Sequence, residues 1–175
     1  DSWTWGQGLG MYAVFQRFLI GVEYQTMWGQ LSRSGQESLR VDGAYGLLQA
    51  GYLAVSTPAF QVYPYLGIGR GGIGLRSSQS LNSLLSVSQG SNQNLNSLNA
   101  SGWLLDLGLG ANFTVPMSPE NGSDARGPSA SLRAGYLLPL GNPEWTANEL
   151  PVSGGPALNP GGLYVRLMLG FGGLQ

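Results

Sequence analysis

The chain has 175 residues, the length of one domain that can bury a core or close a small barrel. Only 10% of its residues are charged, against roughly 25% in soluble domains, and its eight basic residues are all arginine. A formal net charge of -1 gives no reason to expect a nucleic acid partner, and the absence of His and Cys excludes Ser-His-Asp and Cys-His catalysis, disulfides and His or Cys metal sites. We therefore expect no cofactor and no enzyme.

Seven segments alternate apolar residues with small or polar ones, which is the period of a β-strand. In chain order they cover 8–15, 18–29, a segment from 39, 61–75, 103–115, 131–140 and 163–172. The first can be traced back towards Trp3 and Trp5. Tight turns are predicted at Gln16-Arg17 and at Thr57-Pro58-Ala59. The third segment changes phase at Leu47-Leu48, which predicts a β-bulge there.

The segment from Trp103 to Val115 shows the pattern best. Its odd-numbered residues from Leu105 are all apolar, whereas the residues between them are Asp106, glycines, Asn112 and Thr114. A solvated sheet face would carry Lys, Glu and Thr instead. An apolar face directed outward around a small, polar and charged interior is typical of a barrel in lipid.

The connections between these segments are of two kinds. Long polar loops are predicted at about 77–101 and 141–161, and an intermediate one at 116–128. In an up-and-down meander the long loops fall on one rim and the shorter turns on the other. The sequence therefore predicts a single antiparallel up-and-down β-barrel over 1–175, of about eight strands with seven visible.

The aromatic residues support this arrangement. With the predicted strand directions, all five phenylalanines fall near the short-turn rim, namely Phe15, Phe18, Phe60, Phe113 and Phe171. Four tryptophans fall near the other rim, namely Trp3, Trp5, Trp28 and Trp103. Two aromatic girdles on opposite rims are expected where a barrel crosses two membrane interfaces.

Six charged residues are predicted to face inward and to pair, namely Glu23, Asp42, Asp106, Arg70, Arg133 and Arg166. An arginine facing lipid at mid-depth costs about 2 to 4 kcal/mol, and its planar fork suits carboxylates. We interpret these residues mainly as a structural filling of the barrel. A proton or ion path and a glycosidase-like carboxylate pair are the alternatives. The G-x-G-x-x-G match at 67–72 continues as strand, so a nucleotide site is not favoured.

The chain resembles the small bacterial outer-membrane barrels typified by the OmpA and OmpX transmembrane domains. The segments that carry the resemblance are 63–69, 105–110, 132–136 and 164–171. The resemblance implies an eight-stranded meander with a mostly filled interior, located in the bacterial outer membrane or on the extracellular surface, with function in the loops or in assembly. The chain departs from that family in ending Gly172-Gly173-Leu174-Gln175 instead of on an aromatic residue.

A second departure is the strand count. Bacterial single-chain barrels have an even number of strands with both ends on the short-turn side. Here the first and seventh predicted strands both run towards that side. Three origins of the eighth strand are open: it lies upstream, it is hidden in a loop, or it comes from another molecule. Without it, the backbone edges of the first and seventh strands stay unpaired and open to strand addition.

Two main functions follow as hypotheses. The first is a non-enzymatic, outer-membrane-type barrel with a structural or adhesive role, surrounded by lipid. The second is a subunit of a surface polymer whose apolar belt meets neighbouring barrels, with self-association through the N-terminal strand and the long loops. A soluble β-sandwich is a third alternative; it requires Leu105, Leu107 and Leu109 to pack inward on a second sheet.

Overall fold

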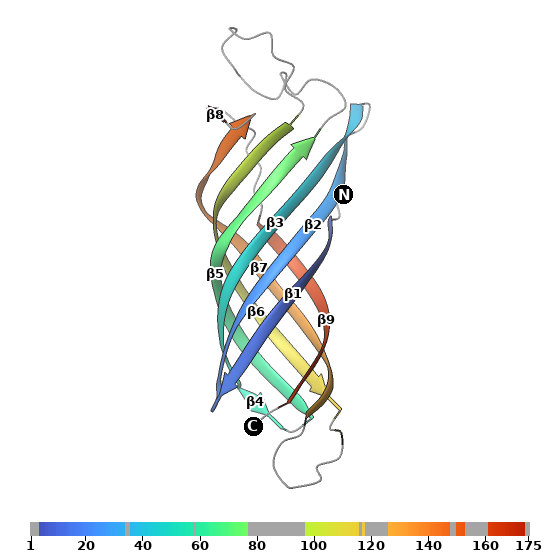
Figure 1. The fold of residues 1–175 in the computed structure, drawn as a ribbon, viewed down its shortest axis with the longest axis vertical. Coiled ribbons are helices and arrows are strands. Elements are labelled where there is room, and N and C mark those ends of the chain that lie inside the picture. Colours follow the sequence, from blue (N-terminus) through green and yellow to red (C-terminus); the bar gives the residue numbers. More distant parts are fainter. Residues whose placement is uncertain are drawn as a thin grey trace.

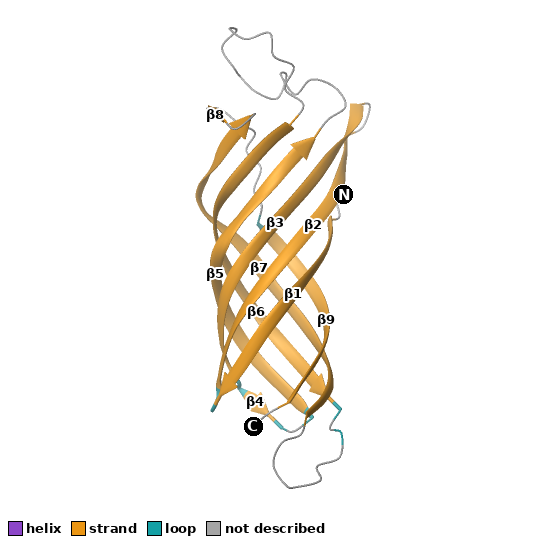
Figure 2. Ribbon diagram, in the orientation of Figure 1, coloured by secondary structure: helices purple, strands orange, loops and turns teal. Residues whose placement is uncertain are grey.

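The computed structural model describes residues 4–33, 36–57, 59–76, 97–115, 117, 126–147, 150–152 and 161–173. Its strands are β1 (Thr4–Phe15), β2 (Phe18–Arg33), β3 (Gln36–Tyr52), β4 (Val55–Ser56), β5 (Phe60–Arg76), β6 (Ser97–Thr114), β7 (Arg126–Ala147), β8 (Leu150–Val152) and β9 (Gly162–Gly173). No helix long and apolar enough to cross a membrane occurs among the residues that the structure describes. Figure 2 shows strands and connections only.

The long strands form one antiparallel meander. Each pairs with the next in the order β1-β2-β3-β5-β6-β7, β9 follows on β7, and the short β4 and β8 pair with β5 and β7. The sheet curls into a tall, barrel-like tube (Figure 1). The ends of this tube as drawn are called here the upper rim, where β2 ends and β3 begins, and the lower rim, where β1 and β9 end. The predicted all-β, up-and-down architecture is confirmed.

The sheet has two edges. Among the described residues, β1 pairs only with β2, and β9 pairs only with β7. Both edge strands run downward and end at the lower rim, but they begin below the upper ends of their neighbours, because β2 continues beyond its pairing with β1 and β7 beyond its pairing with β9 (Figure 1). The seven predicted strands are therefore present, and no eighth long strand occurs in the described part of the chain.

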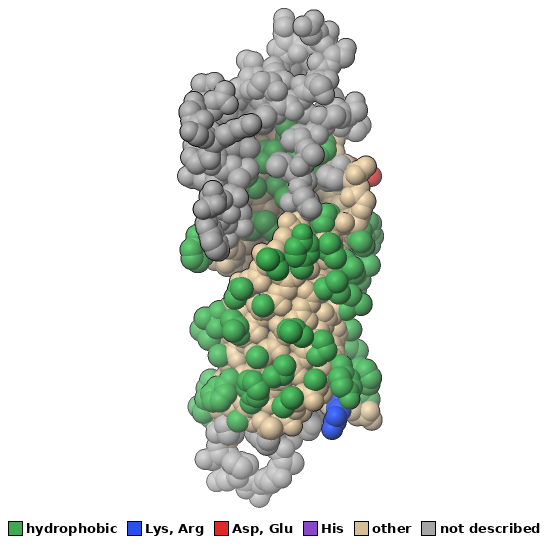
Figure 3. Space-filling model, turned by 180° about the vertical axis from the view of Figure 1, so that it is seen from behind, with side chains coloured by type: hydrophobic (Ala, Val, Ile, Leu, Met, Phe, Trp, Pro, Cys, Tyr) green, Lys and Arg blue, Asp and Glu red, His purple; other side chains and the backbone are tan. Residues whose placement is uncertain are grey.

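The outer face of the sheet is apolar. On β6, Leu107 and Leu109 are 42% and 62% exposed, while Asp106 beside them is completely buried. Figure 3 shows hydrophobic side chains spread over the described outer surface of that face, with charged ones only near its two ends. The β-sandwich alternative is wrong, because the described strands form a single sheet from which these leucines point outward.

The β-bulge predicted at Leu47-Leu48 is wrong. The register of β3 against both neighbouring strands continues without a shift through these residues. Tyr45 and Leu47 are buried, whereas Leu48 is 63% exposed. The inward face of β3 is apolar in its upper part because the interior holds an apolar cluster there, so hydrophobicity alone cannot identify the outward face of this strand.

Strands replace part of each predicted long loop. Residues 97–101 of the predicted loop 77–101 belong to β6, and 77–96 lie outside the described residues. Of the predicted loop 141–161, residues 141–147 continue β7 and 150–152 form β8. The stretches 97–101 and 141–147 are largely polar, which predicts loops, but a strand that extends beyond the apolar belt can carry polar residues on its outer face.

The two tight turns are confirmed. Gln16 adopts a φ of +56°, the left-handed conformation that two-residue hairpin turns require. At the second turn, the Thr57 and Phe60 backbones exchange two hydrogen bonds, and the Thr57 hydroxyl also accepts from the Phe60 amide at 3.0 Å. Both turns lie at the lower rim.

Candidate functional site

Glu23 on β2 lies at the centre of the polar interior. Its side chain is fully buried, and its Oε2 accepts hydrogen bonds from the Tyr12 hydroxyl at 2.6 Å and from Arg133 Nη1 at 3.1 Å. Its Oε1 accepts from Gln25 Nε2 at 2.9 Å and from Arg166. One carboxylate therefore contacts both interior arginines and links β1, β2, β7 and β9.

Arg133 on β7 is held by oxygen acceptors and by rings. Its Nη1 also donates to the Tyr12 hydroxyl and to Gln49 Oε1, both at 2.8 Å, and its Nε donates to the Tyr63 hydroxyl at 3.1 Å. The guanidinium carbon lies 4.2 Å from the centre of the Tyr12 ring. A planar guanidinium stacks well on an aromatic face, so these contacts compensate for the water that the buried charge has lost.

Asp106 on β6 and Arg166 on β9 form the second charged pair. Asp106 Oδ2 accepts from Gln49 Nε2 at 3.0 Å and lies 3.7 Å from Arg166 Nη1, and its Oδ1 accepts from the Tyr164 hydroxyl. Arg166 Nη2 donates to the Tyr45 hydroxyl at 2.8 Å, and its guanidinium carbon lies 3.7 Å from the centre of the Tyr164 ring. Gln49 therefore bridges the two pairs.

All seven long strands contribute to these contacts. The interior network is defined here as Tyr12, Glu23, Gln25, Tyr45, Gln49, Gln61, Tyr63, Tyr65, Asp106, Asn112, Ser131, Arg133, Tyr164 and Arg166. Its two carboxylates and two guanidiniums balance in charge. No buried side-chain nitrogen or oxygen among the described residues lacks a hydrogen-bond partner. A buried charge cluster is stable only when paired and saturated in this way.

Apolar side chains occupy the interior above and below the central charges. A lower cluster contains Leu19, Leu53, Tyr63 and Tyr65, and an upper cluster contains Tyr45, Leu47, Leu104 and Leu137. Side chains fill the interior of small barrels in this manner. Side chains therefore fill the described interior from the lower cluster through the central charges to the upper cluster.

Glycines make room for the tyrosines of the network. A Cβ atom built on Gly110 would lie 2.4 Å from the Tyr63 ring, and one built on Gly108 would lie 2.5 Å from the Tyr65 hydroxyl. Each ring thus covers a glycine on the neighbouring β6. This pairing explains why the inward face of β6 carries glycine next to Asp106.

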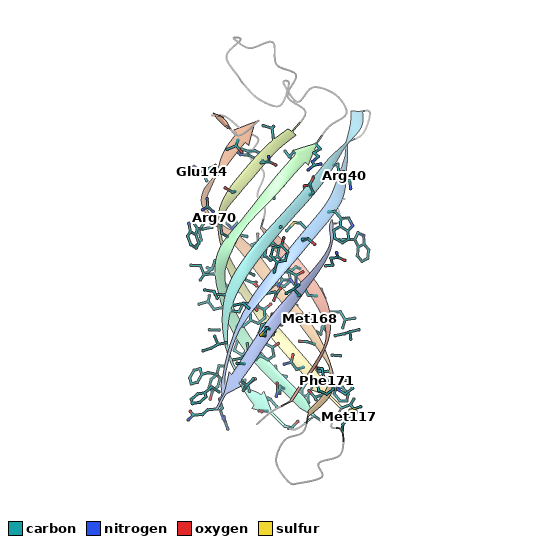
Figure 4. All side chains as sticks on the ribbon, viewed as in Figure 1. Arg40, Arg70, Met117, Glu144, Met168 and Phe171 are labelled. Atoms are coloured by element: carbon teal, nitrogen blue, oxygen red, sulfur yellow. The ribbon has the colours of Figure 1, made fainter. Side chains whose placement is uncertain are left out.

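Four of the six charged residues predicted for the interior meet there, namely Glu23, Asp106, Arg133 and Arg166. The other two assignments are wrong. Asp42 lies on the outer face, because the inward residues of β3 are the odd-numbered Tyr45 and Leu47. It forms an exposed 3.6 Å ion pair with Arg76. Arg70 is exposed, because the inward residues of β5 are the odd-numbered Tyr63 and Tyr65. Figure 4 shows Arg70 on the outside of the sheet, in its upper part.

The exposed aromatic residues form two bands around the sheet, one of phenylalanine and one of tryptophan, which are called here the aromatic rims. All five predicted phenylalanines are exposed, by between 43% and 72%, and Phe171 lies near the lower rim in Figure 4. Trp5, Trp28 and Trp103 are also exposed. Trp3 lies outside the described residues, and Trp145 is buried.

The two aromatic rims are separated by the same number of residues on each of three strands. On β1 the pair is Trp5 and Phe15, on β2 it is Phe18 and Trp28, and on β6 it is Trp103 and Phe113. Each pair is ten residues apart (15 - 5, 28 - 18 and 113 - 103). Because the separation is even, both members of each pair face the same side of the sheet.

The sequence analysis missed the uncharged members of the network. Tyr164 could have been found, since it precedes Arg166 by two residues and so shares its face. The phase change predicted at Leu47-Leu48 turns Leu48 outward and Gln49 inward, so the facing of Gln49 could also have been found, but its partners could not, because they depend on the register between strands. The tyrosines and glutamines supply most of the hydrogen bonds that hold the four charges.

An open groove of about 580 Å³ lies on the upper part of the sheet, away from the interior network. Its walls include Trp28, Asp42, Gly74, Asn99 and Thr146, which are neighbours in register across five strands. Its lining mixes polar side chains with apolar ones such as Met27 and Ile73. It shares no residue with the interior network.

No group of three His, Cys, Asp or Glu side chains that could hold a metal ion occurs among the described residues. The network itself offers carboxylates that are already saturated by guanidinium, phenol and amide donors. Comparison with known proteins found no matching protein family, no matching curated protein and no matching solved structure.

Proposed function

We propose that this chain spans a membrane as a barrel of the outer-membrane type and has a structural or adhesive role. The observation that carries the proposal is the pair of aromatic rims, ten residues apart on three strands. Ten residues of strand extend about 33 Å, and at the usual barrel tilt of about 40° they rise about 25 Å. This height matches the apolar band of membrane barrels, which is about 25 Å.

The outward residues between the rims support the proposal. On β2, Ile20 and Val22 are 62% and 50% exposed, and on β9, Leu167 and Leu169 are 71% and 81% exposed. In water such a continuous apolar surface favours aggregation, whereas lipid solvates it. Lipid is therefore the proposed partner of the belt, and the bacterial outer membrane its proposed location.

The filled interior supports a structural role over transport. Two apolar clusters flank a network of balanced charge, and the buried polar side-chain atoms of the described interior already have hydrogen-bond partners without a solute. The contacting parts of the molecule in this proposal are the predicted long polar loops and the barrel edges.

Depth-dependent fluorescence quenching tests the proposal. Single-tryptophan variants that keep Trp28 or Trp103, and a third that carries Val22→Trp in a tryptophan-free background, are reconstituted into vesicles whose lipids bear bromine at different depths. We expect shallow bromines to quench Trp28 and Trp103 most, and deep bromines to quench position 22 most. A stable, monodisperse monomer in detergent-free buffer, with all three tryptophans open to iodide, contradicts the proposal.

The two unpaired edges favour a second candidate function, a subunit of a surface polymer joined by strand complementation or loop packing. A strand donated from one copy to the edge of the next, repeated head to tail, gives an open polymer. Deleting residues 1–7 removes the start of β1, and this candidate predicts that oligomers then disappear while single barrels remain. Unchanged assembly contradicts the role of that segment.

A further inference from the structure

We infer that the groove on the upper part of the sheet binds a neutral saccharide, whose hydroxyl groups contact Arg40, Asp42 and Asn99 and whose ring packs on Trp28. These four residues line the groove, and its volume of about 580 Å³ lies within the usual range of ligand pockets. The interior network and the apolar belt do not require such a site. The inference therefore goes beyond the proposed function.

The register of the strands shows that the polar side chains of the groove share the outer face. Asp42 lies on that face, and residues that pair directly across neighbouring strands point to the same side of a sheet. The row of direct partners that contains Asp42 consists of Trp28, Asp42, Gly74, Asn99 and Thr146. The next row on this face has only small side chains in the groove, namely Thr26, Ala44, Gly72 and Ser101. These small side chains form the floor of the groove.

Two oxygen acceptors converge over Gly74. A Cβ atom built on this glycine would lie 3.1 Å from Asp42 Oδ2 and 3.2 Å from Asn99 Oδ1. Neither oxygen accepts a hydrogen bond from another side chain in the described part of the chain, whereas Asp42 Oδ1 lies 3.6 Å from Arg76 Nε. Two acceptors that approach one point favour a ligand with hydrogen-bond donors. An anion would instead bring negative charge next to the Asp42 carboxylate.

Arg40 supplies donors beside these acceptors. It precedes Asp42 by two residues on β3 and so shares its face, and it is exposed in the upper part of the sheet (Figure 4). Its guanidinium forms no ion pair with another described side chain. A ligand that donates to Asp42 and Asn99 and also accepts from Arg40 needs groups that do both. Hydroxyl groups have this property, and a sugar carries several of them.

Trp28 supplies an apolar surface at the β2 end of the same row. Its side chain is 43% exposed, so part of the indole is open to a ligand. The C–H groups on the face of a sugar ring are apolar and pack on an aromatic ring. From Trp28 to Thr146 the row crosses four strand spacings, about 19 Å, so the groove can take several sugar units in line.

Titration with neutral tetrasaccharides tests the inference. The chain is kept in a zwitterionic detergent without sugar groups, and the probes are maltotetraose, cellotetraose and chitotetraose. We expect at least one probe to bind and to shift the emission of a single-tryptophan variant that keeps Trp28. The variant that keeps Trp103 should show no shift, because Trp103 lies outside the groove lining. Equal shifts in the two variants overturn the inference.

Two substitutions in the groove, each with a matched control, test the contacts. Asn99→Ala removes one acceptor, and we expect it to weaken binding at least about tenfold. Ala44→Leu fills the floor without removing a polar group and should weaken binding by at least as much. The controls are Asn142→Ala and Ala50→Leu, at exposed positions outside the groove lining, and both should change the affinity less than about twofold. Unchanged binding in both groove variants, or equal losses in the controls, overturns the inference.

A second arm distinguishes a free sugar from a lipid-borne one. The variant that keeps Trp28 is placed in phosphatidylcholine nanodiscs with or without digalactosyl diacylglycerol. A shift with the glycolipid alone assigns a lipid-borne sugar, and shifts with the free probes assign a free one. No shift in either arm overturns the inference, as does displacement of the bound sugar by inorganic phosphate. The free-sugar arm does not depend on the outcome of the lipid-quenching experiment, so the two proposals can fail separately.

Discussion

Glu23 makes the interaction on which the charge balance of the interior depends, since its carboxylate contacts both arginines. Replacing it with glutamine leaves two buried guanidiniums facing the single carboxylate of Asp106. Removing one partner of a buried ion pair costs about 3 to 5 kcal/mol, because the remaining charge is uncompensated. We expect Glu23→Gln to lower the free energy of unfolding by this amount, measured by urea titration in detergent or lipid.

Two further variants make that measurement specific. Asp42→Asn removes a carboxylate from an ion pair whose side chains are 42% and 70% exposed, and exposed pairs contribute at most about 1 kcal/mol. The double variant Glu23→Gln with Arg133→Met removes one charge of each sign, so we expect it to lose less than the two single changes added together. Additive losses would contradict the account of the network as a balanced unit.

A substitution at Gly110 tests how closely the Tyr63 ring packs on this glycine. A methyl group at this position would lie 2.4 Å from the Tyr63 ring, whose hydroxyl binds Arg133 and Asn112, so the ring must move and its hydrogen bonds weaken. Overpacking of this kind costs about 1 to 3 kcal/mol. We expect Gly110→Ala to destabilise by that amount in the same titration. Gly172→Ala, where no atom lies within 4 Å of the added Cβ, serves as the control and should change little.

The pairing of the four charges was predictable from the sequence, but their uncharged partners were not. Alternation alone assigns Asp106 and Arg166 to the face opposite the leucines. It gives no information about which residues meet across the interior, since that depends on the register between strands. Gln49 connects Arg133 to Asp106 only because β3, β6 and β7 bring those three side chains together.

At the scale of the elements, the hairpin between β1 and β2 carries a residue that does not suit its conformation. Gln16 has a φ of +56°, and a residue with a Cβ pays about 1 to 2 kcal/mol for the left-handed conformation. We expect Gln16→Gly to raise the free energy of unfolding by about 0.5 to 1 kcal/mol, because part of the gain is lost to the greater freedom of glycine in the unfolded chain. Arg17→Gly is the control, since Arg17 has no positive φ, and should bring no gain.

The strands themselves were predictable where their two faces differ in polarity. β6 alternates leucine with aspartate and glycine, so both its period and its facing follow from the sequence. In the upper part of β3 the inward Val41, Tyr45 and Leu47 are as apolar as outward residues elsewhere, because they face the upper apolar cluster or the interior beside it. Where interior and exterior are both apolar, hydrophobicity indicates a strand but not its facing.

At the scale of the whole molecule, the interior and the outer belt impose opposite requirements on the same strands. Around the network the interior takes glycine, tyrosine and paired charges, whereas the belt takes leucine, valine and isoleucine, so at this level the strands need two chemically distinct faces. The ten-residue interval between tryptophan and phenylalanine then sets how far the belt extends along β1, β2 and β6. The stability cost of a substitution on the outer face should therefore depend on its depth within the belt. The cost of a substitution on the inner face should depend on the network contacts that it removes.

Arginine substitutions on the outer face distinguish lipid from water as the surroundings of the belt. Val22 lies between the rims, four residues from Phe18 and six from Trp28, and is 50% exposed; Phe15 lies on the lower rim and is 72% exposed. In lipid vesicles we expect Val22→Arg to lower the free energy of unfolding by about 2 to 4 kcal/mol and Phe15→Arg by no more than about 1 kcal/mol. In water, neither exposed substitution should cost more than about 0.5 kcal/mol. Equal effects of the two variants in vesicles would show that depth does not matter, and the belt would then face protein or water instead of lipid.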